Sequence, residues 1–166
     1  MKNLVVVVMM VCVLGACKKD KPKEVVLNAK PTASVLANGM PLLTVTKEDG
    51  STMSLKDLTG KVLLVCYNPD CDHCQREGKR LSENKDMIKD YQVYFLTPDV
   101  KNQANTFAKD YNLIEPNIYF VTAEVTPIIR AIGSINTVPT FFIFRDQQLI
   151  KRMEGEVSME DLRRLL

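Results

Sequence analysis

Short apolar runs alternate with segments of helical periodicity through most of this chain. The runs are rich in β-branched and aromatic residues, and Gly, Pro, Asn and Asp punctuate the chain between them, a pattern that favours strands. Two of the runs flank Asp49-Gly50, a pair typical of hairpin turns. We expect strands at residues 42–46, 51–55, 61–67, 91–96, 117–121, 140–144 and 148–153.

Other segments carry the spacing of amphipathic helices. Gly133 marks the end of one of them, and Ser158, with Asp161 three residues later, forms a capping-box pattern before the last. The expected helices cover residues 71–88, 102–111, 124–132 and the segment after Ser158. Alternation of strands and helices predicts an α/β domain whose central sheet carries helices on both faces.

The N-terminal segment has a different character. Lys2 precedes an unbroken apolar run at residues 4–14, which is too short for a stable membrane-spanning helix. Small residues then lead directly to Cys17, so residues 1–16 are predicted to be a cleaved signal peptide. A cysteine at that place resembles the bacterial lipobox, which implies a lipid on Cys17. The alternative is a plain signal peptide with an incidental cysteine.

Residues 17–31 are polar and highly charged, and they cannot bury apolar area. We expect them to form a flexible tether, followed by a folded domain at residues 32–166. Together these segments predict a lipoprotein of the bacterial cell envelope, anchored in a membrane through Cys17 and facing the periplasm. Which membrane holds the anchor is left open.

Composition adds one exclusion. Apolar residues make up 46% of the chain and charged residues 25%, as in soluble globular proteins. The formal net charge is only +2, and the basic residues are scattered without interleaved aromatic residues. We therefore expect no nucleic-acid partner.

Cys71 and Cys74 form a Cys-x-x-Cys pair between a predicted strand and a predicted helix. The helix N-terminus favours a thiolate on the first sulfur, and the second sulfur follows one turn later, within bonding reach. This arrangement predicts reversible disulfide chemistry. Once the signal peptide is removed and Cys17 is lipidated, Cys66 remains as a third thiol. We expect Cys66 to be buried and inert in its strand, with a resolving role as the alternative.

His73, the only histidine in the sequence, lies between the two cysteines. An imidazole there can stabilise the Cys71 thiolate, which makes the disulfide more oxidising. Asp70 and Asp72 oppose this effect because they are negative and adjacent to Cys71. His73 is thus a candidate catalytic residue, with a solvent-facing side chain of little electronic effect as the alternative.

These landmarks together resemble the thioredoxin fold, and within it the TlpA/ResA-like branch of extracytoplasmic proteins, over residues 32–166. The resemblance rests on the hairpin around Gly50, the Cys-x-x-Cys pair between strand and helix, a helix and strand inserted at 102–120, and Val138-Pro139 before an apolar strand. It implies a thioredoxin-like fold with a mixed central sheet and an N-terminal hairpin extension.

The same resemblance implies roles for the motif residues. Cys71 is the exposed attacking thiol, and Cys74 is the inner thiol that resolves the mixed disulfide with a substrate. A cis bond before Pro139 would lie opposite the Cys71 sulfur and expose the backbone of Val138 for pairing with an extended substrate segment. An ordinary trans proline is the alternative.

The chain departs from that family at several positions. Asp70 and Tyr67 stand where the family usually has tryptophan. Val65 stands where many thioredoxins carry a buried carboxylate or amide that manages protons. The proton of Cys74 must therefore be taken by water or by another side chain, which the motif itself does not name.

The expected function is that of a thiol-disulfide oxidoreductase, more a reductase than an oxidase or isomerase, that acts on protein thiols with a redox partner protein and needs no cofactor. A non-enzymatic binding module is an alternative of another class. We expect no metal, because a zinc site would lack accessible ligands and copper delivery would lack a second histidine. A peroxiredoxin would need Thr or Ser where Asn68 stands.

Overall fold

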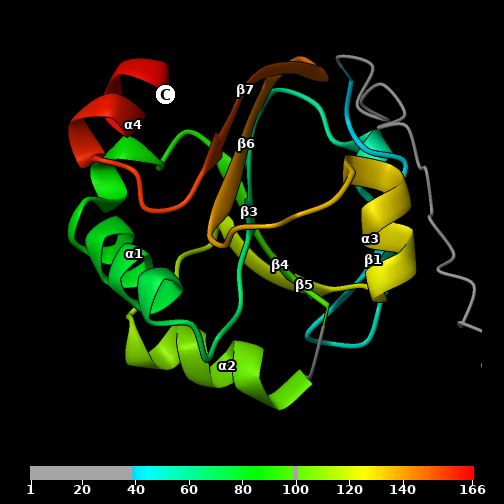
Figure 1. The fold of residues 1–166 in the computed structure, drawn as a ribbon, viewed down its shortest axis with the longest axis horizontal. Coiled ribbons are helices and arrows are strands. Elements are labelled where there is room, and N and C mark those ends of the chain that lie inside the picture. Colours follow the sequence, from blue (N-terminus) through cyan, green and yellow to red (C-terminus); the bar gives the residue numbers. More distant parts are fainter. Residues whose placement is uncertain (1–38, 99–100) are drawn as a thin grey trace, which may run out of the picture. The chain divides into compact units, whose positions relative to one another are not determined.

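The computed structural model describes residues 39–98 and 101–166. Within these residues a seven-stranded sheet has the order β2-β1-β5-β4-β3-β6-β7 (Figure 1). β3, β4 and β5 run parallel to one another, and the remaining pairs are antiparallel, so the sheet is mixed as expected. The strands are β1 Thr44–Lys47, β2 Thr52–Ser54, β3 Lys61–Cys66, β4 Gln92–Thr97, β5 Ile118–Thr122, β6 Thr140–Arg145 and β7 Gln148–Glu154.

Helices cover both faces of the sheet, which confirms the predicted α/β architecture. The helices α1, α2 and α4 lie on one face, and α3 lies on the other (Figure 1). Because α1 connects the parallel strands β3 and β4, it begins at the carboxyl end of β3, the edge where α/β proteins place their functional sites. The helices are α1 Asp72–Glu83, α2 Lys101–Asp110, α3 Val125–Ile132 and α4 Met159–Leu165, with short 3₁₀ turns η1 Leu55–Asp57 and η2 Lys85–Met87.

Strand β3 is central and is buried on both of its faces. Leu63 and Val65 pack toward α1 and α4, whereas Leu64 and Cys66 pack toward α3. This two-sided burial explains why the sequence of β3 is continuously apolar instead of alternating. It also fixes the start of α1 firmly, because the strand that leads to it cannot slip without exposing apolar side chains.

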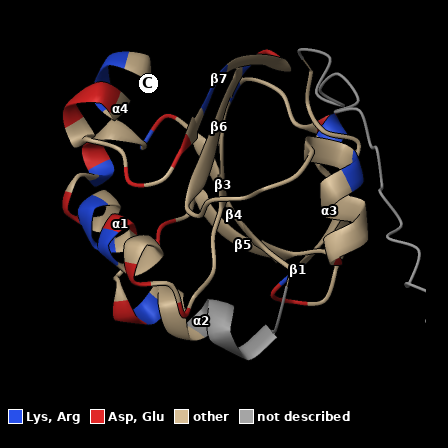
Figure 2. Ribbon diagram, in the orientation of Figure 1, with Lys and Arg blue, Asp and Glu red and all other residues tan. Residues whose placement is uncertain are grey.

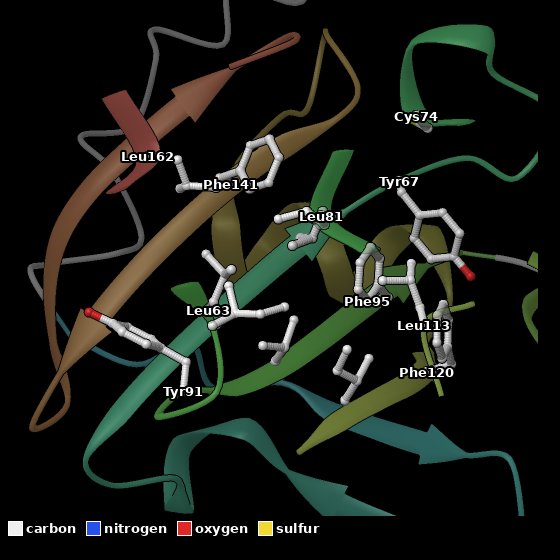
Figure 3. Close-up of a cluster of buried hydrophobic side chains, with 14 of the residues drawn as sticks. Leu63, Tyr67, Cys74, Leu81, Tyr91, Phe95, Leu113, Phe120, Phe141 and Leu162 are labelled. Atoms are coloured by element: carbon white, nitrogen blue, oxygen red, sulfur yellow. The ribbon is translucent and has the colours of Figure 1, made fainter. Parts of the chain in front are cut away.

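The core on the α1 side is rich in aromatic rings (Figure 3). The Phe95 and Phe120 rings stack with centroids 4.9 Å apart, and Tyr67 lies 4.8 Å from Phe107 of α2. Tyr67, at a position where the resembled family usually has tryptophan, is therefore a core residue that joins the end of β3 to α2.

Two sequence expectations differ in detail from the structure. The helix expected to reach residue 88 ends at Glu83, because Asn84 leaves helical geometry and donates its side-chain amide to the Arg80 carbonyl at 2.9 Å. At α4, the Ser158 hydroxyl accepts from the Asp161 N–H at 3.1 Å, as expected of a cap. The Asp161 carboxylate, however, accepts from that hydroxyl and not from the Ser158 backbone amide of a full capping box.

The predicted signal peptide at 1–16, the lipidated Cys17 and the tether at 17–31 lie outside the described residues. The predicted domain start at residue 32 also lies outside them. The described residues all belong to one compact unit. Among them, no helix is long and apolar enough to cross a membrane.

Candidate active site

Cys71 lies at the N-cap of α1, where the chain turns from β3 into the helix. The Asn68 side-chain oxygen accepts from the Asp70 N–H at 2.9 Å, and the Asn68 carbonyl accepts from the Cys71 N–H at 3.1 Å. These bonds form a compact turn that holds Cys71 half-buried at the protein surface. The expected helix start is confirmed, and the Cys71 sulfur lies at the positive end of the helix dipole.

Cys74 lies one turn inward and is only 2% exposed. Its sulfur accepts from the backbone N–H of Asn68 at 3.4 Å. Burial nevertheless dominates and raises the pKa of the Cys74 thiol to about 12. Both Cys71 and Cys74 carry free thiols, so one accessible sulfur stands in front of one protected sulfur.

The loop before β6 approaches Cys71 from a distant part of the chain. The Val138–Pro139 peptide bond is cis, as expected. The Cys71 sulfur lies 3.9 Å from the Val138 carbonyl oxygen. This approach follows from the sheet, because Cys66 at the end of β3 pairs with Thr140 at the start of β6.

His73 is engaged in a cluster of charged side chains that the sequence did not reveal. Its ring Nδ1 lies 2.5 Å from Oε1 of Glu156, a residue of the segment between β7 and α4. Arg76 and Arg80 of α1 also bind the Glu156 carboxylate. The hydrogen bonds from Arg76 and His73 lower the pKa of Glu156 to about 2, so it is ionised at physiological pH. Figure 2 shows that positions of both charges lie along α1 and α4.

Glu77 is a second residue that motif-based reasoning missed. It lies one turn after Cys74 on α1 and is 1% exposed. Burial raises its pKa to about 7, although Arg80 and the Val157 backbone N–H favour the charged form. A signal was present in the sequence, because Glu77 shares the spacing of the buried residues Cys74, Gly78 and Leu81 on one face of the helix.

Cys66 is 4% exposed, so its expected burial is confirmed. Burial also raises the pKa of the Cys66 thiol. Its side chain belongs to the cluster on the α3 face of the sheet, whereas Cys74 belongs to the cluster on the opposite face. Within the described residues, no group of three or more His, Cys, Asp or Glu side chains is arranged to hold a metal ion.

A groove of about 530 Å³ adjoins the Cys71 turn and reaches α3. Pro69 and Val138 line it beside Cys71, and Val125 and Ile129 of α3 line it farther away. Both α3 side chains are exposed, Val125 to 54% and Ile129 to 46%. Asp70 is the charged residue in this otherwise neutral and mostly apolar lining.

An accessible cysteine at a helix N-terminus, a buried cysteine one turn later and a cis-proline loop opposite them define a thioredoxin-like thiol-disulfide oxidoreductase. The chain belongs to the AhpC/TSA family, whose model matches residues 36–153.

Individual relatives agree with this class. The chain is 28% identical over 130 residues to the thiol-disulfide oxidoreductase ResA of Bacillus thuringiensis, a match that covers 76% of this chain and 73% of the relative. A secreted Mycobacterium tuberculosis disulfide oxidoreductase homologous to E. coli DsbE has a similar fold, with a TM-score of 0.63 at 18% identity over 75% of this chain and 93% of that chain. StoA of Bacillus subtilis gives a TM-score of 0.57 at 16% identity over 74% and 93% of the two chains.

Proposed function

We propose that Cys71 and Cys74 are the redox-active pair through which this protein reduces disulfides in other proteins outside the cytoplasm. The observation that carries the proposal is the placement of the Cys71 sulfur, half-buried and 3.9 Å from the Val138 carbonyl, in front of the buried Cys74. A substrate can reach the first sulfur but not the second. The two thiols therefore take different roles.

The reaction has two steps. The Cys71 thiolate attacks one sulfur of a substrate disulfide, forms a mixed disulfide and releases the other substrate sulfur as a thiolate. Cys74 then loses its proton and attacks the Cys71 sulfur. The second substrate sulfur leaves as a thiolate, and Cys71 and Cys74 remain joined as a disulfide. Two electrons pass from the protein dithiol to the substrate, and a redox partner protein must return them.

Glu77 is our candidate for the group that takes the Cys74 proton. The Cys74 thiol, with its pKa raised to about 12, needs a base during the second step. Glu77 lies one turn after Cys74, on the same buried face of α1. Its pKa of about 7 is close to physiological pH. A group that titrates there can accept a proton and return it in the next cycle.

Exposed negative charge supports the reducing direction. Asp70 and Asp72 flank Cys71 and are both exposed. Negative neighbours disfavour the thiolate, and destabilising the reduced form makes a dithiol more reducing. An oxidase or isomerase is the competing function, and His73 is the feature that favours it.

The groove between the Cys71 turn and α3 supports a protein substrate. A polypeptide bonded to Cys71 and paired with the backbone of Val138 would continue into this groove. Its apolar lining suits an unfolded or extended segment that carries an apolar side chain near the reacting cysteine. The lipid anchor at Cys17 and a periplasm-facing position in the cell envelope remain part of the proposal, supported by the sequence of residues 1–17.

The reduction potential of the pair tests the proposal directly. The protein is equilibrated with mixtures of reduced and oxidised glutathione, and the free thiols of Cys71 and Cys74 are quantified by alkylation and mass spectrometry. A potential near −270 mV supports a reductase, and one near −120 mV supports an oxidant. Cys66→Ala is the matched control, and we expect it to leave the equilibrium unchanged. Failure of the pair to form a reversible disulfide would contradict the enzymatic role altogether.

A further inference from the structure

We propose that Glu156 is a positioning residue that holds His73 and Arg76 beside Cys71 and thereby keeps the Cys71 thiolate reactive. This inference rests on the proposed redox role of Cys71. Glu156 touches neither cysteine in any contact found among the described residues. It acts through two basic side chains of α1, His73 and Arg76, which lie far from it in the sequence.

The backbone around Glu156 is fixed on both sides. Gly155, with a φ of 80°, donates its N–H to the Pro139 carbonyl at 2.8 Å. Val157 is buried, and its backbone N–H is near enough to Glu77 of α1 to favour the ionised carboxylate. The Glu156 carboxylate therefore projects from a segment tied both to the cis-proline loop and to α1, and its own side chain is only 23% exposed.

One carboxylate gathers three side chains of α1. Oε1 accepts from Arg76 Nε at 3.0 Å and from Arg76 Nη2 at 2.5 Å, and it lies 2.5 Å from His73 Nδ1. Oε2 lies 3.1 Å from Arg80 Nη2. Without Glu156, His73 and Arg76 would lose the carboxylate that holds them on α1, whereas Arg80 would keep its ion pair with Glu77 at 3.2 Å.

The contacts hold the His73 ring in either protonation state. Arg76 Nη2 lies 2.7 Å from His73 Nδ1, and a guanidinium nitrogen can only donate. When Nδ1 carries no hydrogen it accepts from Arg76, and when it carries one it donates to Glu156. Nδ1 is occupied within the cluster in both cases, so Nε2 is the ring nitrogen left for Cys71, substrate or solvent.

Arg76 interacts electrostatically with Cys71. Glu156 has the largest effect in raising the pKa of Arg76, and Asp72 and the Cys71 thiolate raise it further. A cation held there offsets Asp70 and Asp72, which disfavour the thiolate needed for attack. Glu156 carries a negative charge of its own, but the Arg76 and Arg80 guanidinium groups that bind its carboxylate balance that charge. Removing Glu156 would therefore disfavour the Cys71 thiolate if Glu156 acts by positioning its partners. It would favour the thiolate if Glu156 acts through its own charge.

The experiment compares Glu156→Gln with Glu154→Gln in the full chain. Glu154 is the matched control, because it is a neighbouring acid that pairs with Arg152 at 2.9 Å and not with α1. We measure the rate at which iodoacetamide alkylates Cys71 at pH 7, and the equilibrium of the Cys71–Cys74 pair with glutathione. Glu156→Gln is expected to slow alkylation about three- to tenfold, the range of two exposed charge interactions, and to shift the equilibrium toward the protein disulfide.

A background that lacks both the His73 and the Arg76 side chain completes the test. With His73→Asn and Arg76→Gln in place, Glu156→Gln is expected to cause no further slowing. Unchanged or faster alkylation in Glu156→Gln, or an equal effect of Glu154→Gln, overturns the inference. If the wild-type pair still exchanges with glutathione in that case, the proposed function stands without it. A change confined to the thermal midpoint marks a merely structural role and also overturns it.

Discussion

The Cys71 sulfur lies 3.9 Å from the carbonyl oxygen of Val138, although 67 residues separate the two in the chain. This contact joins the two motifs on which the proposed chemistry depends. It places a backbone acceptor beside the sulfur that a substrate would join. A substrate segment that reaches Cys71 must therefore pass the Val138 backbone and the groove next to it.

The two cysteines should respond differently to substitution. Cys71→Ser is expected to abolish disulfide exchange, because the other two described thiols, Cys66 and Cys74, are buried. Cys74→Ser should accumulate mixed disulfides with substrate proteins, because the resolving thiol is missing. Non-reducing electrophoresis of cells that express each variant measures both outcomes, with Cys66→Ser as the control. If Cys74→Ser traps no partner protein, the binding-module alternative gains support.

The groove residue Ile129 should affect protein substrates selectively. Ile129→Glu places a charge in the apolar lining, and we expect exchange with a protein disulfide to slow about tenfold while exchange with glutathione is unchanged. Ile150→Glu is a closely matched control, because Ile150 on β7 is 45% exposed, against 46% for Ile129, and does not line the groove. Equal losses with both substrates would show that Ile129 does not contact the polypeptide.

The buried Glu77 should make stability depend on pH. Its folded-state pKa of about 7 lies above the ordinary value of 4.5, so the folded state holds the proton more tightly than the unfolded state does. The free energy of unfolding of the wild type should therefore match that of Glu77→Gln below about pH 4.5. Above pH 7, the free energy of unfolding of the wild type should be about 3 kcal/mol lower than that of Glu77→Gln.

Urea denaturation from pH 4 to pH 8 measures this difference. Glu83→Gln, an exposed position on the same helix, is the control for loss of one carboxylate. A pH-independent difference between wild type and Glu77→Gln would mean that Glu77 does not titrate in this range. In that case it could not serve as the base for Cys74 near pH 7.

A larger side chain at Gly78 should destabilise the fold. A Cβ atom there would lie 2.8 Å from Cζ of Phe107, and the rings of Tyr67 and Tyr111 prevent Phe107 from moving aside. Crowding of this kind costs about 1–3 kcal/mol, whereas Gly→Ala in a helix gains about 0.5–1 kcal/mol. We expect Gly78→Ala to lose about 1 kcal/mol net in urea denaturation. Lys79→Ala, at the exposed neighbouring position, is the control, and stabilisation by Gly78→Ala would show that α2 can shift away from α1.

Much of the fold follows from local pattern. The apolar run that became β3 and the Gly133 stop of α3 were predictable because burial and turn chemistry are encoded by neighbouring residues. The end of α1 was predicted too late, because Met87 and Ile88 continue the apolar spacing while Asn84 interrupts the backbone. Periodicity records which residues are buried, but it does not record where the backbone hydrogen bonds stop.

The candidate site likewise has features that follow from local sequence and features that depend on long-range contacts. The sequence by itself determined that two cysteines lie one turn apart at a helix start, because that spacing is purely local. It also contained Glu77 on the buried face of α1, at helical spacing from Cys74. The family resemblance implied that Val138 lies opposite Cys71, and the structure places the Cys71 sulfur 3.9 Å from its carbonyl; only the tertiary structure decided that Glu156 binds His73, which lies 83 residues away. These contacts depend on β6 pairing with β3 and on the segment after β7 folding back onto α1, and no local pattern records such long-range pairings.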